Sequence, residues 1–278
     1  MWGYCEGGKS MEKHYLVIGI VLVFLVGGLS GCITPQTTEY FNEEYDANEN
    51  TIITVSTING QIEISVWDGD NVSLNAVKKS SFGKEELDNI EINVIENENQ
   101  IEIEAKYIGQ RSTTPSVDMN IKVPRNVTVD SAITSNGAIQ ISGIKGDVIT
   151  TTSNGAILID DVDGYVTATT SNGRIEIRGT TGVKDLRSSN LGIEAEVFNF
   201  KENISISTSN GGITVYINSS LNADIDMTTS NGQISINGVT LDLTISEEKH
   251  KAGKLGDGGN ALDIQTSNGN INLRKLEI

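Results

Sequence analysis

Two glutamates have the spacing of a catalytic carboxylate pair. Glu176 and Glu194 lie 18 positions apart and occupy the same place in a repeated sequence unit. Carboxylate pairs cleave glycosidic bonds, with one group acting as acid and the other as base or nucleophile. The sequence places no aromatic residue beside them on which a sugar ring would stack. This favours an ordinary solvent-facing charge pattern and leaves a polysaccharide-active enzyme as the alternative.

A short acidic cluster has the chemistry of a calcium site. Asp160, Asp161 and Asp163 would supply the carboxylate oxygens that Ca²⁺ prefers. The neighbouring repeats do not carry the same cluster, which favours a solvated turn without metal.

Histidine and cysteine are too scarce for the common catalytic centres. His14 and His250 are the only histidines, and Cys5 and Cys32 are the only cysteines. A histidine-based zinc site, a Ser-His-Asp triad and a Cys-His dyad therefore all lack their parts. We expect no cofactor and no catalytic residues.

Three arginines lie close together in the sequence of an acidic chain. Arg174, Arg178 and Arg187 would suit an anionic glycan, but ion pairs with Glu176 and Asp185 account for them equally well.

All these residues lie within or beside a repeated motif, Thr-Ser-Asn-Gly-x-Ile-x-Ile. Three copies follow one another at Thr134–Ile141, Thr152–Ile159 and Thr170–Ile177, with a period of 18 residues. A regular period of this kind is typical of stacked repeat architectures. An outlying copy lies at Asn59, and the asparagines of the main series are Asn136, Asn154, Asn172, Asn190, Asn210, Asn231 and Asn268.

Alternation of apolar residues on both sides of the Asn-Gly pair predicts strand, turn, strand in each unit. A meander of hairpins is the alternative, because Asn-Gly is also the strongest hairpin signal. The constant period favours a parallel β-solenoid (β-helix) with coils of roughly 18–21 residues. Identical positions would then lie about 4.8 Å apart. We expect the asparagines to form an Asn ladder, with Asn154 pointing inward between Asn136 and Asn172.

The chain divides into four predicted segments. Residues 1–31 are predicted as a lipoprotein signal peptide, 32–50 as a flexible tether, 51–125 as a less regular β N-terminal cap and 126–278 as the solenoid repeats. The last two segments are expected to form one continuous domain. The segment Glu247–Asn260 is predicted as an exposed loop, because it lengthens one repeat step.

The N-terminal segment has the features of an export signal. Lys13 precedes an apolar run from Tyr15 to Leu29, which suits a signal-peptide core better than a membrane span. The run ends in Leu-Ser-Gly-Cys, which resembles the lipobox of prokaryotic lipoproteins. That resemblance implies that Cys32 becomes the lipidated first residue, and that the protein lies outside the cytoplasm, anchored to the cell membrane.

The net charge of −17 argues against nucleic acid as a partner. The predicted partners are instead the membrane, through Cys32, and a surface protein or glycan.

The whole pattern resembles the putative-adhesin β-strand-repeat family of prokaryotic cell-envelope proteins, a domain of unknown function. The resemblance covers roughly residues 51–278 and rests on three features: the tandem motif, the Val-Pro pair before it, and the ending Gly256–Gly269. The motif departs from the pattern at Ser188–Gly192, where a leucine intrudes. The family implies a β-helical fold, an envelope location and an adhesive or stress-response role, and it supplies no catalytic residues.

We therefore expect a lipid-anchored surface solenoid that acts as a non-catalytic adhesion, binding or structural module. The alternatives are the polysaccharide-active enzyme and an envelope stress-sensing accessory protein.

Overall fold

The computed structural model describes residues 36–109 and 115–277. The chain divides into two units, Met1–Thr34 and Pro35–Ile278, and the description concerns the second. The predicted signal peptide and Cys32 lie outside the described residues.

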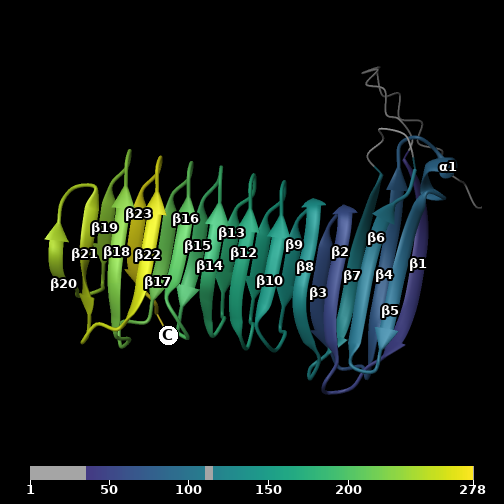
Figure 1. The fold of residues 1–278 in the computed structure, drawn as a ribbon, viewed down its shortest axis with the longest axis horizontal. Coiled ribbons are helices and arrows are strands. Elements are labelled where there is room, and N and C mark those ends of the chain that lie inside the picture. The colour runs from purple at the N-terminus through teal and green to yellow at the C-terminus, as the bar shows by residue number, and fades with distance from the viewer. Residues whose placement is uncertain (1–35, 110–114, 278) are drawn as a thin grey trace, which may run out of the picture. The chain divides into compact units, whose positions relative to one another are not determined.

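The second unit consists of two β-sheets with the apolar core between them (Figure 1). One short helix, α1 (Lys84–Leu87), is described. Sheet A has the spatial order β1 (Thr37–Asp46), β4 (Asn71–Ser80), β7 (Ser116–Pro124), β3 (Ile62–Trp67), β9 (Ile139–Ser142), β11 (Ile157–Asp160), β13 (Ile175–Arg178), β15 (Ile193–Val197), β17 (Ile213–Ile217), β23 (Ile271–Lys275), β19 (Ile234–Asn237). Sheet B has the order β20 (Asp242–Ser246), β21 (His250–Leu255), β18 (Ala223–Thr229), β22 (Asn260–Thr266), β16 (Ile204–Thr208), β14 (Gly182–Ser188), β12 (Tyr165–Thr170), β10 (Val148–Thr152), β8 (Thr128–Asn136), β2 (Ile52–Asn59), β6 (Gln100–Tyr107), β5 (Ile90–Asn97).

Each repeat gives one strand to sheet B and, after its Asn-Gly turn, one strand to sheet A. Neighbouring coils pair in parallel, so that Ile157 of β11 lies between Ile139 of β9 and Ile175 of β13. These isoleucines are fully buried, because alternate residues of these strands face the core. The parallel β-solenoid is confirmed and the meander is wrong.

The N-terminal end differs from the predicted boundaries. Strands β2 and β3 form a regular coil inside the stack, between the coil of β6 and β7 and the coil of β8 and β9. The cap consists of β1, β4 and β5, which all pair antiparallel to their neighbours.

The tether predicted over 32–50 is corrected at its centre, because Thr37–Asp46 forms β1. This strand pairs with β4 along its whole length, and Phe41 and Tyr45 pack against the core. Antiparallel pairing of β1 covers the open edge of β4, which would otherwise expose unpaired backbone groups. The polar composition of the segment concealed two inward aromatic residues.

The C-terminal coil is inserted out of sequence order. Strands β22 and β23 lie between the coil of β16 and β17 and the coil of β18 and β19. The predicted loop Glu247–Asn260 is also corrected, because β21 lies within it. Strand β21 pairs antiparallel with β18 and β20 and caps sheet B.

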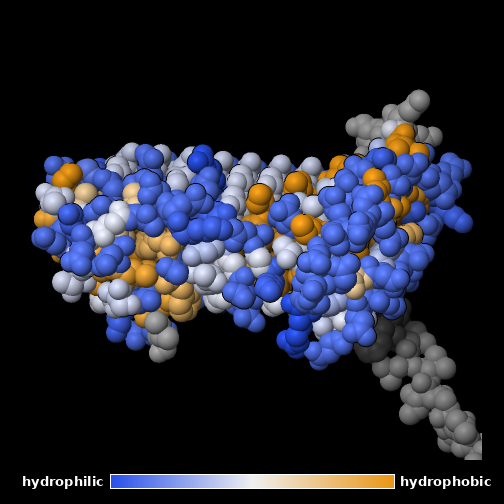
Figure 2. All heavy atoms as spheres, turned by 60° about the horizontal axis from the view of Figure 1, so that its bottom comes forward, coloured by the Kyte–Doolittle hydropathy of each residue, from blue (hydrophilic) through white to orange (hydrophobic). Residues whose placement is uncertain are grey.

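A local irregularity in the strand pairing agrees with the sequence pattern. The apolar alternation shifts by one residue between Val129 and Ala132, which predicts a bulge near Ser131. The structure shows a register shift there against β2, and β5 and β6 form an antiparallel hairpin. The surface seen in Figure 2 is mostly hydrophilic, with hydrophobic atoms in separate groups.

One acidic residue connects several coils. Burial raises the pKa of Asp147, but hydrogen bonds from Lys184, Lys201 and the Tyr165 N–H outweigh it and lower the pKa from 3.8 to about 2. The lysine Nζ atoms lie 2.8 and 2.9 Å from the carboxylate. Lys201 also lies 5.4 Å from the centre of the Tyr165 ring.

Acid should weaken this connection. The pKa of Asp147 is lower in the folded protein than in the unfolded chain. Its ion pairs therefore stabilise the folded state fully above pH 4, and this stabilisation disappears as the pH falls towards 2. We expect Asp147→Asn to lose no more than about 1 kcal/mol at pH 7, since solvent screens a partly exposed ion pair. The free energies of unfolding of the two proteins, measured with denaturant, should therefore converge between pH 4 and pH 2. A difference that grows over this range would contradict the assignment.

Candidate functional site

The asparagines of the repeat form a continuous chain of side-chain hydrogen bonds. Each Nδ2 donates to the Oδ1 of the asparagine in the adjacent coil, over 2.5 to 3.0 Å. The order in space is Asn59, Asn136, Asn154, Asn172, Asn190, Asn210, Asn268, Asn231. The series ends at Asn59, whose Nδ2 donates to the Pro115 carbonyl over 3.1 Å.

The orientation of these side chains differs from the prediction. Asn154 was expected to point inward, but it is exposed, as are Asn136 and Asn172. The inward alternation of the strand ends at Thr152, and the chain turns at the next two residues. The amides therefore lie along the rim of the stack.

The buried polar residue of the motif is its first one. The hydroxyl of that residue donates to the carbonyl of a motif glycine in the adjacent coil, over 2.9 to 3.1 Å. We call these residues the Thr row: Thr134, Thr152, Thr170, Ser188, Thr229 and Thr266. Sequence reasoning missed this role, although the constant hydroxyl at a period of 18 residues is a usable signal.

The motif glycine permits the closest approach of two coils. A Cβ on Gly173 would lie 1.6 Å from the Gly155 carbonyl oxygen, and one on Gly155 would lie 1.8 Å from that of Gly137. No side chain fits at these distances, so these two copies of the motif require glycine.

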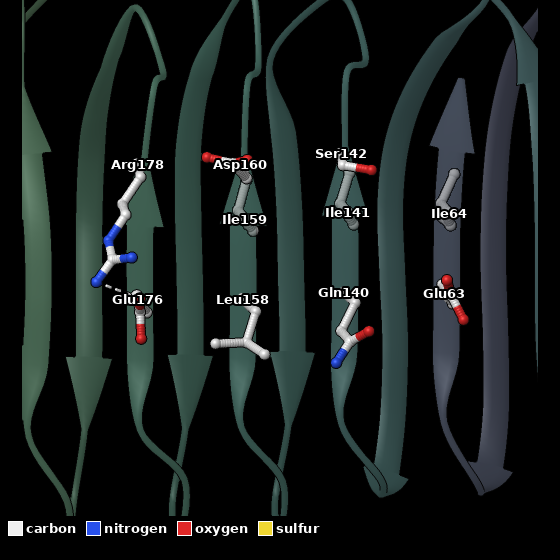
Figure 3. A pocket seen from close by; sticks show the side chains of 10 residues that line it. All are labelled: Glu63, Ile64, Gln140, Ile141, Ser142, Leu158, Ile159, Asp160, Glu176 and Arg178. Atoms are coloured by element: carbon white, nitrogen blue, oxygen red, sulfur yellow. Dashed lines mark ion pairs between the residues drawn. The ribbon is translucent and has the colours of Figure 1, made fainter. Parts of the chain in front are cut away.

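An open groove of 390 Å³ crosses the outer face of sheet A over β3, β9, β11 and β13. Figure 3 shows its two rows of outward side chains. The first row is Glu63, Gln140, Leu158 and Glu176, and the second is Ser142, Asp160 and Arg178. Parallel register places each row on equivalent positions of neighbouring strands. In the second row hydrogen-bonding groups therefore recur at about 4.8 Å, whereas Leu158 interrupts the first row.

Glu176, one of the two candidate carboxylates, lies at one end of this groove, and both carboxylates form ion pairs. Glu176 and Glu194 are direct register partners on β13 and β15. Arg174 lies 2.7 Å from Glu176 and 3.0 Å from Glu194, and Arg178 lies 2.5 and 3.0 Å from them. Like charges opposite one another destabilise a sheet, and the two guanidinium groups compensate for this. The carboxylates accept hydrogen bonds here, whereas glycoside cleavage requires one of them to donate a proton.

One further expectation about this region needs correction. Arg187 lies on β14 of sheet B and pairs with Asp185 at 2.7 Å, so it does not join Arg174 and Arg178. On β17 the register partner of Glu194 is Thr214, and the aromatic Tyr216 pairs with Glu196 instead.

The three candidate calcium ligands do not converge. No group of three or more metal-ligating side chains occurs within residues 36–109 and 115–277. Asp160 faces the groove, and Asp161 occupies a left-handed turn position with φ 54°. The equivalent positions in the adjacent coils are Gly143 and Gly179, both with positive φ. Asp161 is therefore better explained by the turn than by a metal.

Replacing Asp161 with Gly should stabilise the protein. A left-handed conformation costs about 1–2 kcal/mol for most residues, and less for Asp, so we expect a gain of up to about 1 kcal/mol. Denaturant unfolding with and without Ca²⁺ measures this. A loss of stability seen only in Ca²⁺ would contradict the turn explanation and indicate a metal ligand.

No helix among the described residues is long and apolar enough to span a membrane.

Comparison with known proteins identifies the family. A model of the Toastrack DUF4097 family matches residues 53–274, and no curated protein matches the chain. Similar solved structures include a "putative cell adhesion protein" from Clostridium sporogenes ATCC 15579, at 15% identity and TM-score 0.34, covering 86% of this chain and 100% of that one. A "putative adhesin" from Bacteroides fragilis NCTC 9343 has 12% identity and TM-score 0.43, covering 86% and 97%. A "putative lipid binding protein" from Parabacteroides distasonis ATCC 8503 has 14% identity and TM-score 0.39, covering 87% and 97%.

The family match spans most of the described solenoid, from β2 to β23. It confirms the resemblance drawn from the repeated motif. This chain is a member of the Toastrack DUF4097 family.

Proposed function

We propose that this protein is a non-catalytic binding module, held outside the cytoplasmic membrane by lipid on Cys32. Its binding face is the groove on sheet A, and its ligand is an extended polar polymer such as a surface glycan.

The observation that carries this proposal is the second row of the groove. Ser142, Asp160 and Arg178 place hydrogen-bonding groups at equivalent positions of the neighbouring strands β9, β11 and β13. A polymer with regularly spaced hydroxyl groups matches such a surface. The groove is open to solvent along its length, which suits a long ligand better than a small one.

The ion pairs of Glu176 and Glu194 with arginine favour a binding function over a catalytic one. Both carboxylates form ion pairs with Arg174 and Arg178, so the site lacks a free proton donor at this pair. The predicted export signal and the lipobox-like ending support the proposed location, because an exported and anchored solenoid would meet surface glycans.

Binding to purified envelope glycans tests the proposal. Leu158 lies in the centre of the groove, so Leu158→Arg should block the groove and lower affinity at least about tenfold. Thr151→Arg is the matched control, because Thr151 lies on the outer face of sheet B. The control should bind as the parent does.

Two results would overturn the proposal. Equal binding by both variants would show that the groove is not the ligand site. Shortening of the glycan by the parent, abolished in Glu176→Gln, would show that the pair is catalytic. Mass spectrometry of the membrane-bound protein tests the anchor separately, and an unmodified Cys32 would contradict it.

A further inference from the structure

Two large hydrophobic side chains project from one corner of the N-terminal cap. Phe82 is 62% exposed and Ile108 is 53% exposed. Both lie beyond the ends of strands, Phe82 after β4 and Ile108 after β6.

Backbone contacts place Phe82 beside the start of β1 and Ile108 beside the end of helix α1. Thr37 is the register partner of Ser80, whose Oγ accepts a hydrogen bond from the Phe82 N–H at 3.0 Å. Helix α1 follows and contacts β1 and β4. Just after this helix, the Asn89 carbonyl accepts a hydrogen bond from the Ile108 N–H at 2.9 Å. Figure 1 shows α1 at this margin of the cap.

Chain connectivity limits the distance between this corner and Cys32. Thr37 is five residues after Cys32. Because an extended chain spans at most about 3.6 Å per residue, the first residue of β1 lies within about 18 Å of Cys32. The predicted tether would have allowed several times this distance, but β1 removes most of its length.

We propose that this corner, formed by Phe82, Ile108 and the start of β1, docks on the lipid bilayer. The proposal rests on the lipid anchor at Cys32. Lipid on Cys32 brings the corner to the bilayer surface, and Phe82 and Ile108 then enter the interface. The C-terminal hairpin of β20 and β21 is at the other end of the stack and remains in water.

The charges around the corner indicate apolar docking rather than attraction to anionic lipid. Lys84, Glu85 and Asp88 are all exposed there, so both signs are present. Docking should therefore occur on vesicles of neutral phosphatidylcholine and should depend little on salt.

Spin-label accessibility on such vesicles tests the proposal with the lipidated protein. Cleavage before Cys32 removes Cys5, and lipid occupies Cys32. A new cysteine is then the only free thiol, so Phe82→Cys and Ile108→Cys can each be labelled. Leu243→Cys is the control, because Leu243 is 39% exposed on β20 at the far end. Thermal melts check that the labelled proteins fold like the parent. We expect labels at 82 and 108 to gain collisions with oxygen and lose collisions with a water-soluble nickel complex.

The outcomes separate the docking from the anchor. A lipidated, vesicle-bound protein whose labels at 82 and 108 behave like the label at 243 would overturn the docking alone. A Cys32 without lipid would overturn the anchor, and the docking with it.

Discussion

Replacing Gly173 with Ala should destabilise the protein by about 3 kcal/mol or more. The new methyl carbon would lie 1.6 Å from the Gly155 carbonyl oxygen, so two coils would have to separate. Overpacking in a rigid interior commonly costs about 1–3 kcal/mol, and backbone against backbone has little room to relax. Chemical denaturation of the purified protein measures the loss.

Gly212→Ala is the matched control. Gly212 also belongs to a motif turn, but its Cβ would lie 3.4 Å from the Asn270 carbonyl oxygen. We expect a much smaller effect there. Equal losses for the two variants would show that close stacking of the motif glycines does not hold the coils together.

Replacing Thr170 with Val should cost about 1–3 kcal/mol. The variant keeps the shape of a buried side chain but removes the hydroxyl that donates to the Gly155 carbonyl at 3.1 Å. A buried acceptor without its donor loses about that much free energy. Thr169→Val is the control, because Thr169 is exposed on the same strand. If both variants unfolded at the same denaturant concentration, the Thr row would have no stabilising role.

The repeat period predicted the stacking of this protein, because only stacked coils keep one residue type in one place. The alternating isoleucines identified the core face, and the structure buries Ile139, Ile157 and Ile175 together. The direction of the asparagine side chains was missed. Strand alternation does not extend through a turn, so it could not show that Asn154 lies on the rim while Thr152 is buried.

The order of the coils could not be predicted from the sequence. Each coil presents a similar set of isoleucines and a Thr-Ser-Asn-Gly turn to its neighbours, so sequence spacing does not decide which coils are adjacent. The hairpin of β20 and β21 occupies the edge of β18, and β22 pairs with the opposite edge. The C-terminal coil is therefore inserted beside β16 and β17.

The groove was only partly predictable. Glu176 and Glu194 were identified from their spacing. The ion pairs of Arg174 and Arg178 with Glu194 could not be predicted, because they depend on the parallel register of β13 and β15. Arg187 was grouped with them by sequence proximity, although the turn between β13 and β14 carries it to the other sheet.

Double-mutant cycles on the Asn ladder test the central claim, that coils stack in the order seen in the structure. Asn210 and Asn268 are 58 residues apart but share a hydrogen bond of 2.8 Å, whereas Asn210 and Asn231 are separated by the inserted coil. We predict a coupling energy of about 0.5–1 kcal/mol for Asn210→Ala with Asn268→Ala. Asn210→Ala with Asn231→Ala should be additive within about 0.3 kcal/mol. Coupling between Asn210 and Asn231, with none between Asn210 and Asn268, would contradict the stacked order.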